Sequence, residues 1–166
     1  MASVTLKGNI VNTTGELPQD GSMARDFLLT DVNLDDKSLS DYSGKNIVLN
    51  IFPSIDTSAC AASVREFNRR VSSFKNTVVL CVSKDLPFAQ KRFCGAEGIE
   101  NVITLSVLRN NDFGNDYGVL LKDGPLKGLL ARSIVVIDDS GKVKYTQLVS
   151  EISDEPDYDS VAEILK

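Results

Sequence analysis

The residues best placed to do chemistry lie where an apolar run gives way to a helical pattern. The stretch Pro53 to Cys60, PSIDTSAC, carries a proline, then Thr57, then a cysteine just before AASVREFNRRVSSF. A thiol in the first turn of a helix faces unpaired backbone N–H groups and the positive end of the helix dipole, which stabilise a thiolate. Cys60 is therefore the candidate nucleophile of the chain.

Other kinds of catalytic site find little support in the composition. The chain contains no histidine, which excludes Cys-His and Ser-His catalysis and removes the commonest transition-metal ligand. Cys60, Cys81 and Cys94 form no C-x-x-C pattern, so we expect neither a metal nor a cofactor. Ionisation alone raises the reactive fraction of a cysteine by roughly 30-fold at most. Fast reaction with a peroxide would also need donors for the leaving oxygen, and the candidates are Thr57 and Arg132, which begins the later segment RSIVVID.

Length and composition predict one soluble domain spanning residues 1–166, with 42% hydrophobic and 25% charged residues. The net charge of -5 argues against a nucleic-acid or anionic-membrane surface. The N-terminal residues MASVTLKGN lack the pattern of an export signal, and no apolar run is long enough to cross a bilayer. We therefore expect a cytoplasmic protein, in which three cysteines are not a structural disulfide framework.

The elements that must position Cys60 can be read on both sides of it. Residues 46–52, NIVLNIF, are apolar apart from Asn50, which predicts a strand buried on both faces. An amphipathic helix follows Pro53, because apolar side chains recur at helical spacing: Val64, Phe67, Val71 and Phe74.

The rest of the chain continues the alternation of strands and helices. A turn at Lys7-Gly8 predicts a hairpin near the N-terminus. Short strand or loop segments then lead to a turn at Ser43-Gly44. Pro87 and Gly95 mark the start and the end of a second predicted helix. Further strands are predicted at 77–83, 101–107 and 132–138, the last forming a hairpin with 142–150, and a final helix at 154–166. This order predicts an α/β fold: a central mixed β-sheet flanked by helices, with an N-terminal β-hairpin, and residues 46–166 resemble a thioredoxin-like core.

Pro53, Thr57 and Cys60 fit the P-x-x-x-[TS]-x-x-C signature of peroxiredoxins. The blocks AASVREFN, DLPFAQKRFCGAEG, NVITLS, YGV, DGPLKGLLAR and EPDY extend the match in order. Over nearly its full length the chain resembles the bacterial thiol peroxidase subfamily, the atypical two-cysteine peroxiredoxins.

That resemblance implies an enzyme and a role for each matched residue. Cys60 would be the peroxidatic cysteine, which becomes a sulfenic acid, and Cys94 the resolving cysteine, which closes an intrachain disulfide with it. Thr57 and Arg132 would orient the peroxide, and Pro53 would shield the pocket from water. The resemblance further implies thioredoxin as reductant, hydrogen peroxide and alkyl hydroperoxides as substrates with a preference for the latter, an antioxidant role and a homodimer.

Each of these residues also has a purely structural interpretation. Cys81, inside VVLCVS, is expected to fill a buried strand position, and Cys60 or Cys94 could do no more than pack. Thr57 is by default a helix N-cap, Arg132 a surface ion pair, and Asp56 a cap or turn residue rather than a base, because a carboxylate beside a thiol disfavours its ionisation. The acidic residues at 154–159 are expected to be a solvated helix start.

Two other functions remain open at this point. Cys60 to Ser63 reads C-x-x-S, which is also found in monothiol relatives of thioredoxin that exchange disulfides with glutathione or proteins. A non-catalytic redox sensor, in which slow oxidation of Cys60 alters a partner contact, is the second.

Overall fold

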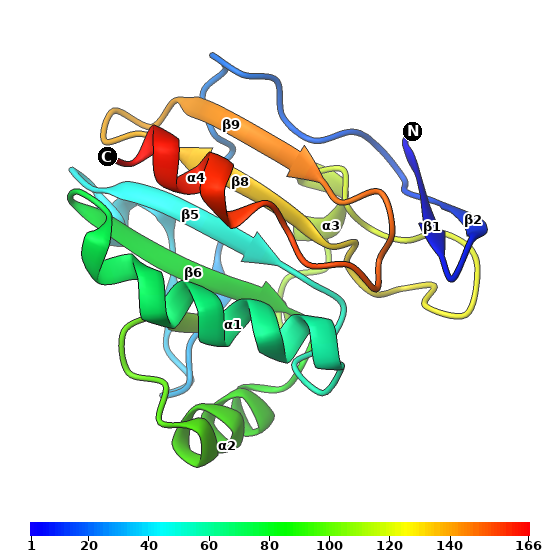
Figure 1. Ribbon diagram of the computed structural model, residues 1–166, viewed down its shortest axis with the longest axis horizontal. Coiled ribbons are helices and arrows are strands. Elements are labelled where there is room, and N and C mark those ends of the chain that lie inside the picture. Colours follow the sequence, from blue (N-terminus) through cyan, green and yellow to red (C-terminus); the bar gives the residue numbers. More distant parts are fainter.

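A mixed seven-stranded sheet forms the centre of the computed structural model, which describes residues 1–166 (Figure 1). Its strands are β3 (Leu29–Thr30), β4 (Asp36–Lys37), β5 (Asn46–Ile51), β6 (Thr77–Ser83), β7 (Ile103–Ser106), β8 (Ser133–Ile137) and β9 (Val143–Leu148). Their spatial order is β4-β3-β7-β6-β5-β8-β9. Strands β5, β6 and β7 are parallel, whereas β8 pairs antiparallel with both β5 and β9.

Helices cover the sheet on both faces. These are α1 (Ser58–Arg70), α2 (Pro87–Glu97), α3 (Phe113–Asp116) and α4 (Tyr158–Ile164). Helices α1 and α4 lie side by side across one face, with α2 next to α1, whereas α3 lies behind the sheet (Figure 1). A separate hairpin of β1 (Ser3–Leu6) and β2 (Asn9–Asn12) stands at the end of the sheet where β5 and β6 finish (Figure 1).

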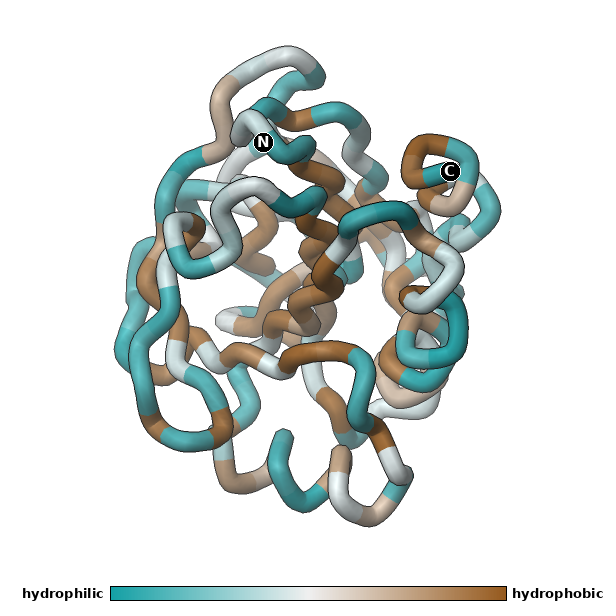
Figure 2. The backbone as a smooth tube through the Cα atoms, turned by 90° about the vertical axis from the view of Figure 1, so that its left-hand side faces the viewer, coloured by the Kyte–Doolittle hydropathy of each residue, from teal (hydrophilic) through white to brown (hydrophobic).

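The alternation of side chains along β5 divides the core into two layers. Ile47, Leu49 and Ile51 join the layer that contains α3, and Val48 and Phe52 join the layer beneath α1 and α2. Both sets are buried, which explains why the run is almost continuously apolar. Figure 2 shows the hydrophobic segments gathered in the middle of the molecule, with hydrophilic segments along its outer loops.

Most of the elements expected from the sequence are present. The strand at 77–83, the N-terminal hairpin and the mixed sheet flanked by helices are confirmed. The prediction that α2 ends at Gly95 is wrong: the helix continues to Glu97, and Gly98, with φ of +66°, adopts the left-handed conformation that ends it. The final helix begins later than predicted, because Asp157 caps it by accepting a hydrogen bond from the Ser160 N–H.

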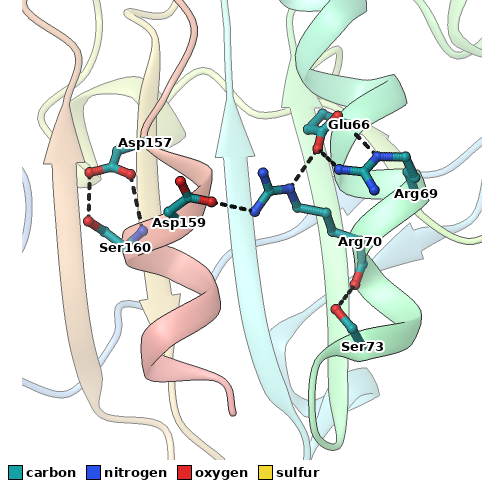
Figure 3. Close-up of polar contacts among 7 residues, drawn as sticks. All are labelled: Glu66, Arg69, Arg70, Ser73, Asp157, Asp159 and Ser160. Atoms are coloured by element: carbon teal, nitrogen blue, oxygen red, sulfur yellow. Dashed lines mark hydrogen bonds and ion pairs between the residues drawn. The ribbon is translucent and has the colours of Figure 1, made fainter.

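A polar cluster joins the C-terminal end of α1 to α4 (Figure 3). Glu66 accepts hydrogen bonds from Arg69 and Arg70, and Arg70 Nη1 donates to Asp159 Oδ1 at 2.9 Å. The Arg70 guanidinium also lies 5.4 Å from the ring centroid of Tyr158, at the start of α4. The far end of α1 is therefore fastened to a second helix.

Candidate active site

Cys60 is the third residue of α1, and a buried arginine contacts its sulfur. Arg132 Nη2 lies 3.1 Å from Cys60 Sγ, and Arg132 Nε donates to the Ile152 carbonyl oxygen at 2.9 Å. Both Cys60 and Arg132 are buried, and Arg132 Nη1 has no hydrogen-bond partner. The structural alternative for Arg132, a surface ion pair, is therefore wrong: the side chain is buried beside the sulfur, and its Nη1 has no partner.

Sheet topology explains why Arg132 reaches a residue so distant in sequence. Strand β5 ends at Ile51, and its antiparallel partner β8 begins opposite it at Ser133. Arg132 precedes β8, so it lies beside the loop that runs from β5 into α1. The Arg132 carbonyl also accepts a hydrogen bond from the Val149 N–H, which fixes its backbone against the segment after β9.

Pro53 and Thr57 lie in that same loop, between β5 and Cys60. Pro53 is buried and Thr57 is exposed. Thr57 occupies the N-cap position of α1, as predicted, but its hydroxyl caps no helix N–H. Instead Thr57 Oγ1 donates to the Ser54 carbonyl at 3.1 Å, which makes it part of a tight turn. Asp56 is exposed in this loop and forms an ion pair with Arg92 of α2.

A cavity of about 480 Å³ borders this loop and brings three of the predicted site residues together. Pro53, Thr57 and Arg132 line it, although Cys60 itself lies behind them. The other walls come from the N-terminal hairpin, the first turn of α1 and two later loops: Leu6, Lys7, Asn9, Val11, Ser58, Ala59, Pro125, Leu126, Ile152 and Ser153. Arg132 is thus the side chain that touches both the cavity and the sulfur.

Glu151 is one of the residues that bind the hairpin wall. Glu151 accepts hydrogen bonds from Thr5 Oγ1 and the Gly8 N–H of the hairpin, at 3.1 and 3.0 Å. Its other oxygen accepts from the Ser153 N–H and hydroxyl. These bonds lower the pKa of Glu151 to about 2, the hydroxyl of Ser153 contributing most. Because Ile152 accepts from Arg132, Glu151 connects the hairpin to the segment that orients the arginine.

Two buried polar residues, one in α1 and one in β5, hold the backbone of Cys60 through hydrogen bonds. Ser63 Oγ donates to the Cys60 carbonyl at 2.7 Å, and Asn50 Nδ2 donates to Ser63 Oγ at 3.1 Å. Neither residue was assigned a role from the sequence. Asn50 could have been noticed as the single polar residue in NIVLNIF, since a buried amide in a central strand requires a polar partner.

Cys94 lies in the last turn of α2 and is half-buried against the same layer of the core as Cys60. Burial raises the pKa of the Cys94 thiol, and a hydrogen bond with Thr104 opposes that shift. The contact between the helices runs through Arg65 of α1, which donates twice to the Glu97 carboxylate of α2 and lies over the Phe93 ring. Cys60 and Cys94 therefore belong to neighbouring helices, and all three cysteines are free thiols.

Cys81 has the surroundings of a packing residue, as expected. It is completely buried in β6, and this burial raises its pKa to about 12. The Asn50 amide lies 3.7 Å from its sulfur. A thiol in this environment stays protonated at neutral pH and is a poor nucleophile.

Comparison of the sequence and fold with known proteins identifies the family of the chain. The Redoxin family model matches residues 19–162. Thiol peroxidases of Corynebacterium glutamicum and Mycobacterium tuberculosis are 56% and 57% identical to the chain over 160 residues, covering 96% of each partner. A peroxiredoxin-like protein from Aquifex aeolicus, solved by crystallography, has a TM-score of 0.93 at 39% identity, over 99% of this chain and 96% of that one. The chain therefore belongs to the redoxin family, in its thiol peroxidase branch.

Proposed function

We propose that this protein reduces hydrogen peroxide and organic hydroperoxides through a sulfenic acid on Cys60 and an intrachain Cys60–Cys94 disulfide. Its family makes it a thiol-dependent peroxidase; the proposal concerns the residues that act and the order of the steps. The observation that carries it is the Arg132 guanidinium, which is buried, lies 3.1 Å from the Cys60 sulfur, has Nη1 unpaired and belongs to a side chain that lines the cavity.

In the first step the Cys60 thiolate attacks the terminal oxygen of the hydroperoxide. A sulfur–oxygen bond forms and the oxygen–oxygen bond breaks; the leaving alkoxide takes up a proton from solvent, which replaces the one that the Cys60 thiol released on ionisation, and becomes the alcohol. Negative charge develops on the leaving oxygen, so donors fixed at that position lower the barrier without reorganisation. Arg132 supplies them, Thr57 orients the peroxide from the loop, and Pro53 excludes water from the sulfur.

In the second step the Cys94 thiol displaces hydroxide from the Cys60 sulfenic acid, which yields a disulfide and one water. The Arg65–Glu97 bonds indicate that α1 and α2 pack side by side. Cys60 Sγ is buried and held 3.1 Å from Arg132 Nη2, and Cys94 is half-buried in the other helix, whereas a disulfide needs the two sulfurs in contact and Cα atoms within about 7 Å. We therefore expect the first turn of α1 and the end of α2 to unwind locally before the bond can close.

In the third step a dithiol reductant returns the disulfide to two thiols and is itself oxidised to a disulfide. We propose thioredoxin for this role, as its family implies. Cys94 is the partly exposed member of the pair, so it offers the sulfur that an external thiolate can attack.

The walls of the cavity support organic hydroperoxides as preferred substrates. Leu6, Val11, Leu126 and Ile152 supply apolar side chains to the same lining as Arg132. Apolar walls with a small number of polar groups favour a substrate that has a hydrocarbon part and one polar end.

We further propose a single-domain cytoplasmic protein that forms a homodimer and binds neither nucleic acid nor membranes. No helix of the structure is both long and apolar enough to span a bilayer. Support for the dimer comes from Leu86, Phe88 and Leu108, which are 50%, 66% and 43% exposed around the start of α2. Light scattering should give twice the chain mass for the wild type and the chain mass for Phe88→Glu; a monomeric wild type would refute the dimer.

The test of the cycle is to add one equivalent of an alkyl hydroperoxide to reduced protein, alkylate the remaining thiols and map the peptides by mass. A rapid Cys60–Cys94 disulfide with Cys81 alkylated supports the proposal. Free thiols that persist, or a Cys60 mixed disulfide formed only with glutathione disulfide, would favour thiol transfer instead. Oxidation too slow for turnover would favour a sensor.

A further inference from the structure

We propose that Asp85 is a positioning residue that latches the Cys60 loop to the start of α2 and thereby sets how readily the first turn of α1 opens. The inference rests on the proposed cycle, because it concerns the step between the sulfenic acid and the disulfide. Asp85 was assigned no function from the sequence.

The Asp85 carboxylate binds the loop directly. Oδ1 accepts from Ser54 Oγ at 2.8 Å, and Oδ2 accepts from the Ile55 N–H at 2.7 Å. Hydrogen bonds to an ionised carboxylate are roughly twice as strong as neutral ones, and this carboxylate is half-buried. By comparison, the Asp56–Arg92 ion pair between the same loop and α2 is about 65% exposed on both sides and contributes little.

The opposite side of Asp85 is anchored in rigid structure. Ser83 Oγ at the end of β6 donates to Asp85 Oδ2 at 2.6 Å, and Ser106 Oγ at the end of β7 donates to the Asp85 carbonyl at 2.6 Å. Gln90 of α2, also buried, donates to Ser83 Oγ and to the Leu105 carbonyl. Asp85 thus connects the Cys60 loop to the ends of two strands directly, and to the middle of α2 through Ser83 and Gln90.

The loop passes this restraint on to the first turn of α1. Both the backbone N–H and the hydroxyl of Thr57 donate to the Ser54 carbonyl, and the Thr57 carbonyl accepts from the Ala61 N–H. Displacing Cys60 toward Cys94 requires this turn to come apart, and with it the bonds of Ser54 and Ile55 to Asp85. The free energy of the Asp85 hydrogen bonds therefore adds to the free energy needed to open the first turn of α1.

This predicts a specific kinetic pattern for Asp85→Asn, which keeps the size of the side chain but places an amide where a carboxylate accepted. Loss of the charge-assisted bonds should raise the open fraction roughly tenfold. As long as the closed form still predominates, oxidation of Cys60 should change little. Disulfide closure, which proceeds from the open form, should be roughly tenfold faster, and sulfinic acid formed in excess peroxide should fall by a similar factor.

The matched control is Asp138→Asn in the β8–β9 turn. That carboxylate also accepts three bonds, from the Ser140 N–H, the Ser140 hydroxyl and the Lys142 N–H, but it follows the residue of β8 that pairs with Ile47, so it lies at the start of β5 and at the opposite end of the sheet from Cys60. Because the chain has no tryptophan, rapid-quench sampling followed by alkylation and mass spectrometry should follow sulfenic acid, disulfide and sulfinic acid separately.

Faster closure in Asp85→Asn alone, with oxidation preserved, supports the latch. A rate constant for disulfide closure within about twofold of wild type overturns the proposal. So does an equal loss of rate in both oxidation and closure, which would indicate general damage to the fold. If the wild type forms no Cys60–Cys94 disulfide, the proposed cycle is wrong. Hydrogen exchange still tests whether Asp85 restrains the Cys60 loop. Residues 54–60 should then exchange roughly tenfold faster in Asp85→Asn than in wild type and Asp138→Asn; equal exchange overturns it.

Discussion

Replacing Arg132 by alanine tests the contact on which the proposed chemistry depends. The substitution removes the donor 3.1 Å from Cys60 Sγ, removes the unpaired Nη1, and leaves the Ile152 carbonyl without its partner. Only the first two changes affect the reacting atoms; the third affects stability.

The expected magnitude follows from these contacts. Loss of a preorganised donor to a developing oxyanion lowers the rate roughly 100- to 1,000-fold, or about 3–4 kcal/mol of transition-state stabilisation. A buried carbonyl left unpaired costs about 1–3 kcal/mol, less than the roughly 5–15 kcal/mol that stabilises a typical domain, so the variant should still fold.

The assay is the second-order rate constant for oxidation of Cys60 by an alkyl hydroperoxide, measured by rapid quench. Arg132→Lys is the control, because it keeps a cation but cannot donate to the sulfur and to Ile152 in the fixed geometry of a guanidinium. The rate constant of Arg132→Lys should lie between those of the wild type and Arg132→Ala. The rate at which dithiothreitol reduces the preformed disulfide should be unchanged in both variants. A folded Arg132→Ala protein that keeps more than about a tenth of the wild-type rate constant would refute the assignment.

Three further outcomes are expected. Cys94→Ser should still oxidise at Cys60 but accumulate sulfenic and then sulfinic acid without turnover; sustained turnover would exclude Cys94 as the resolving residue. Cys81, with a pKa of about 12, should resist iodoacetamide at pH 8 until the protein is unfolded, and labelling in the native state would contradict its burial. Hydrogen bonds from two arginines lower the pKa of Glu66 from 4.5 to about 2, so its contribution to stability is complete above about pH 5 and is lost as pH falls toward 2. Urea unfolding of Glu66→Gln should therefore depend less on pH in that window, and an unchanged pH dependence would count against the network.

Local patterns were enough to predict the elements around Cys60. The apolar run 46–52 and the helical spacing from Val64 onward predict a buried strand followed by an amphipathic helix, and the structure contains both. Helix ends were less predictable. Gly95 and Gly98 are both plausible stops, and only the backbone conformation, with positive φ at Gly98, distinguishes them.

Contacts between distant segments could not be derived from local patterns. Arg132 meets Cys60 because β8 pairs antiparallel with β5, and nothing in the spacing of 72 residues between them indicates that pairing. The family resemblance pointed to Arg132 through the block DGPLKGLLAR, and the roles given to Arg132, Thr57 and Pro53 remain predictions. Asp85 carried a weaker signal: an acidic residue between the end of a predicted strand and a proline at the start of a helix.

The cluster of Glu66, Arg70 and Asp159 has a consequence for the return half of the cycle (Figure 3). Because it holds the far end of α1 helical while the first turn opens, the turn re-forms by extending an existing helix and needs no new nucleus. Helix extension takes nanoseconds per residue, and closing a loop of about ten residues takes roughly 10–100 ns. In the proposed cycle, re-forming the first turn of α1 is therefore expected to be too fast to limit turnover.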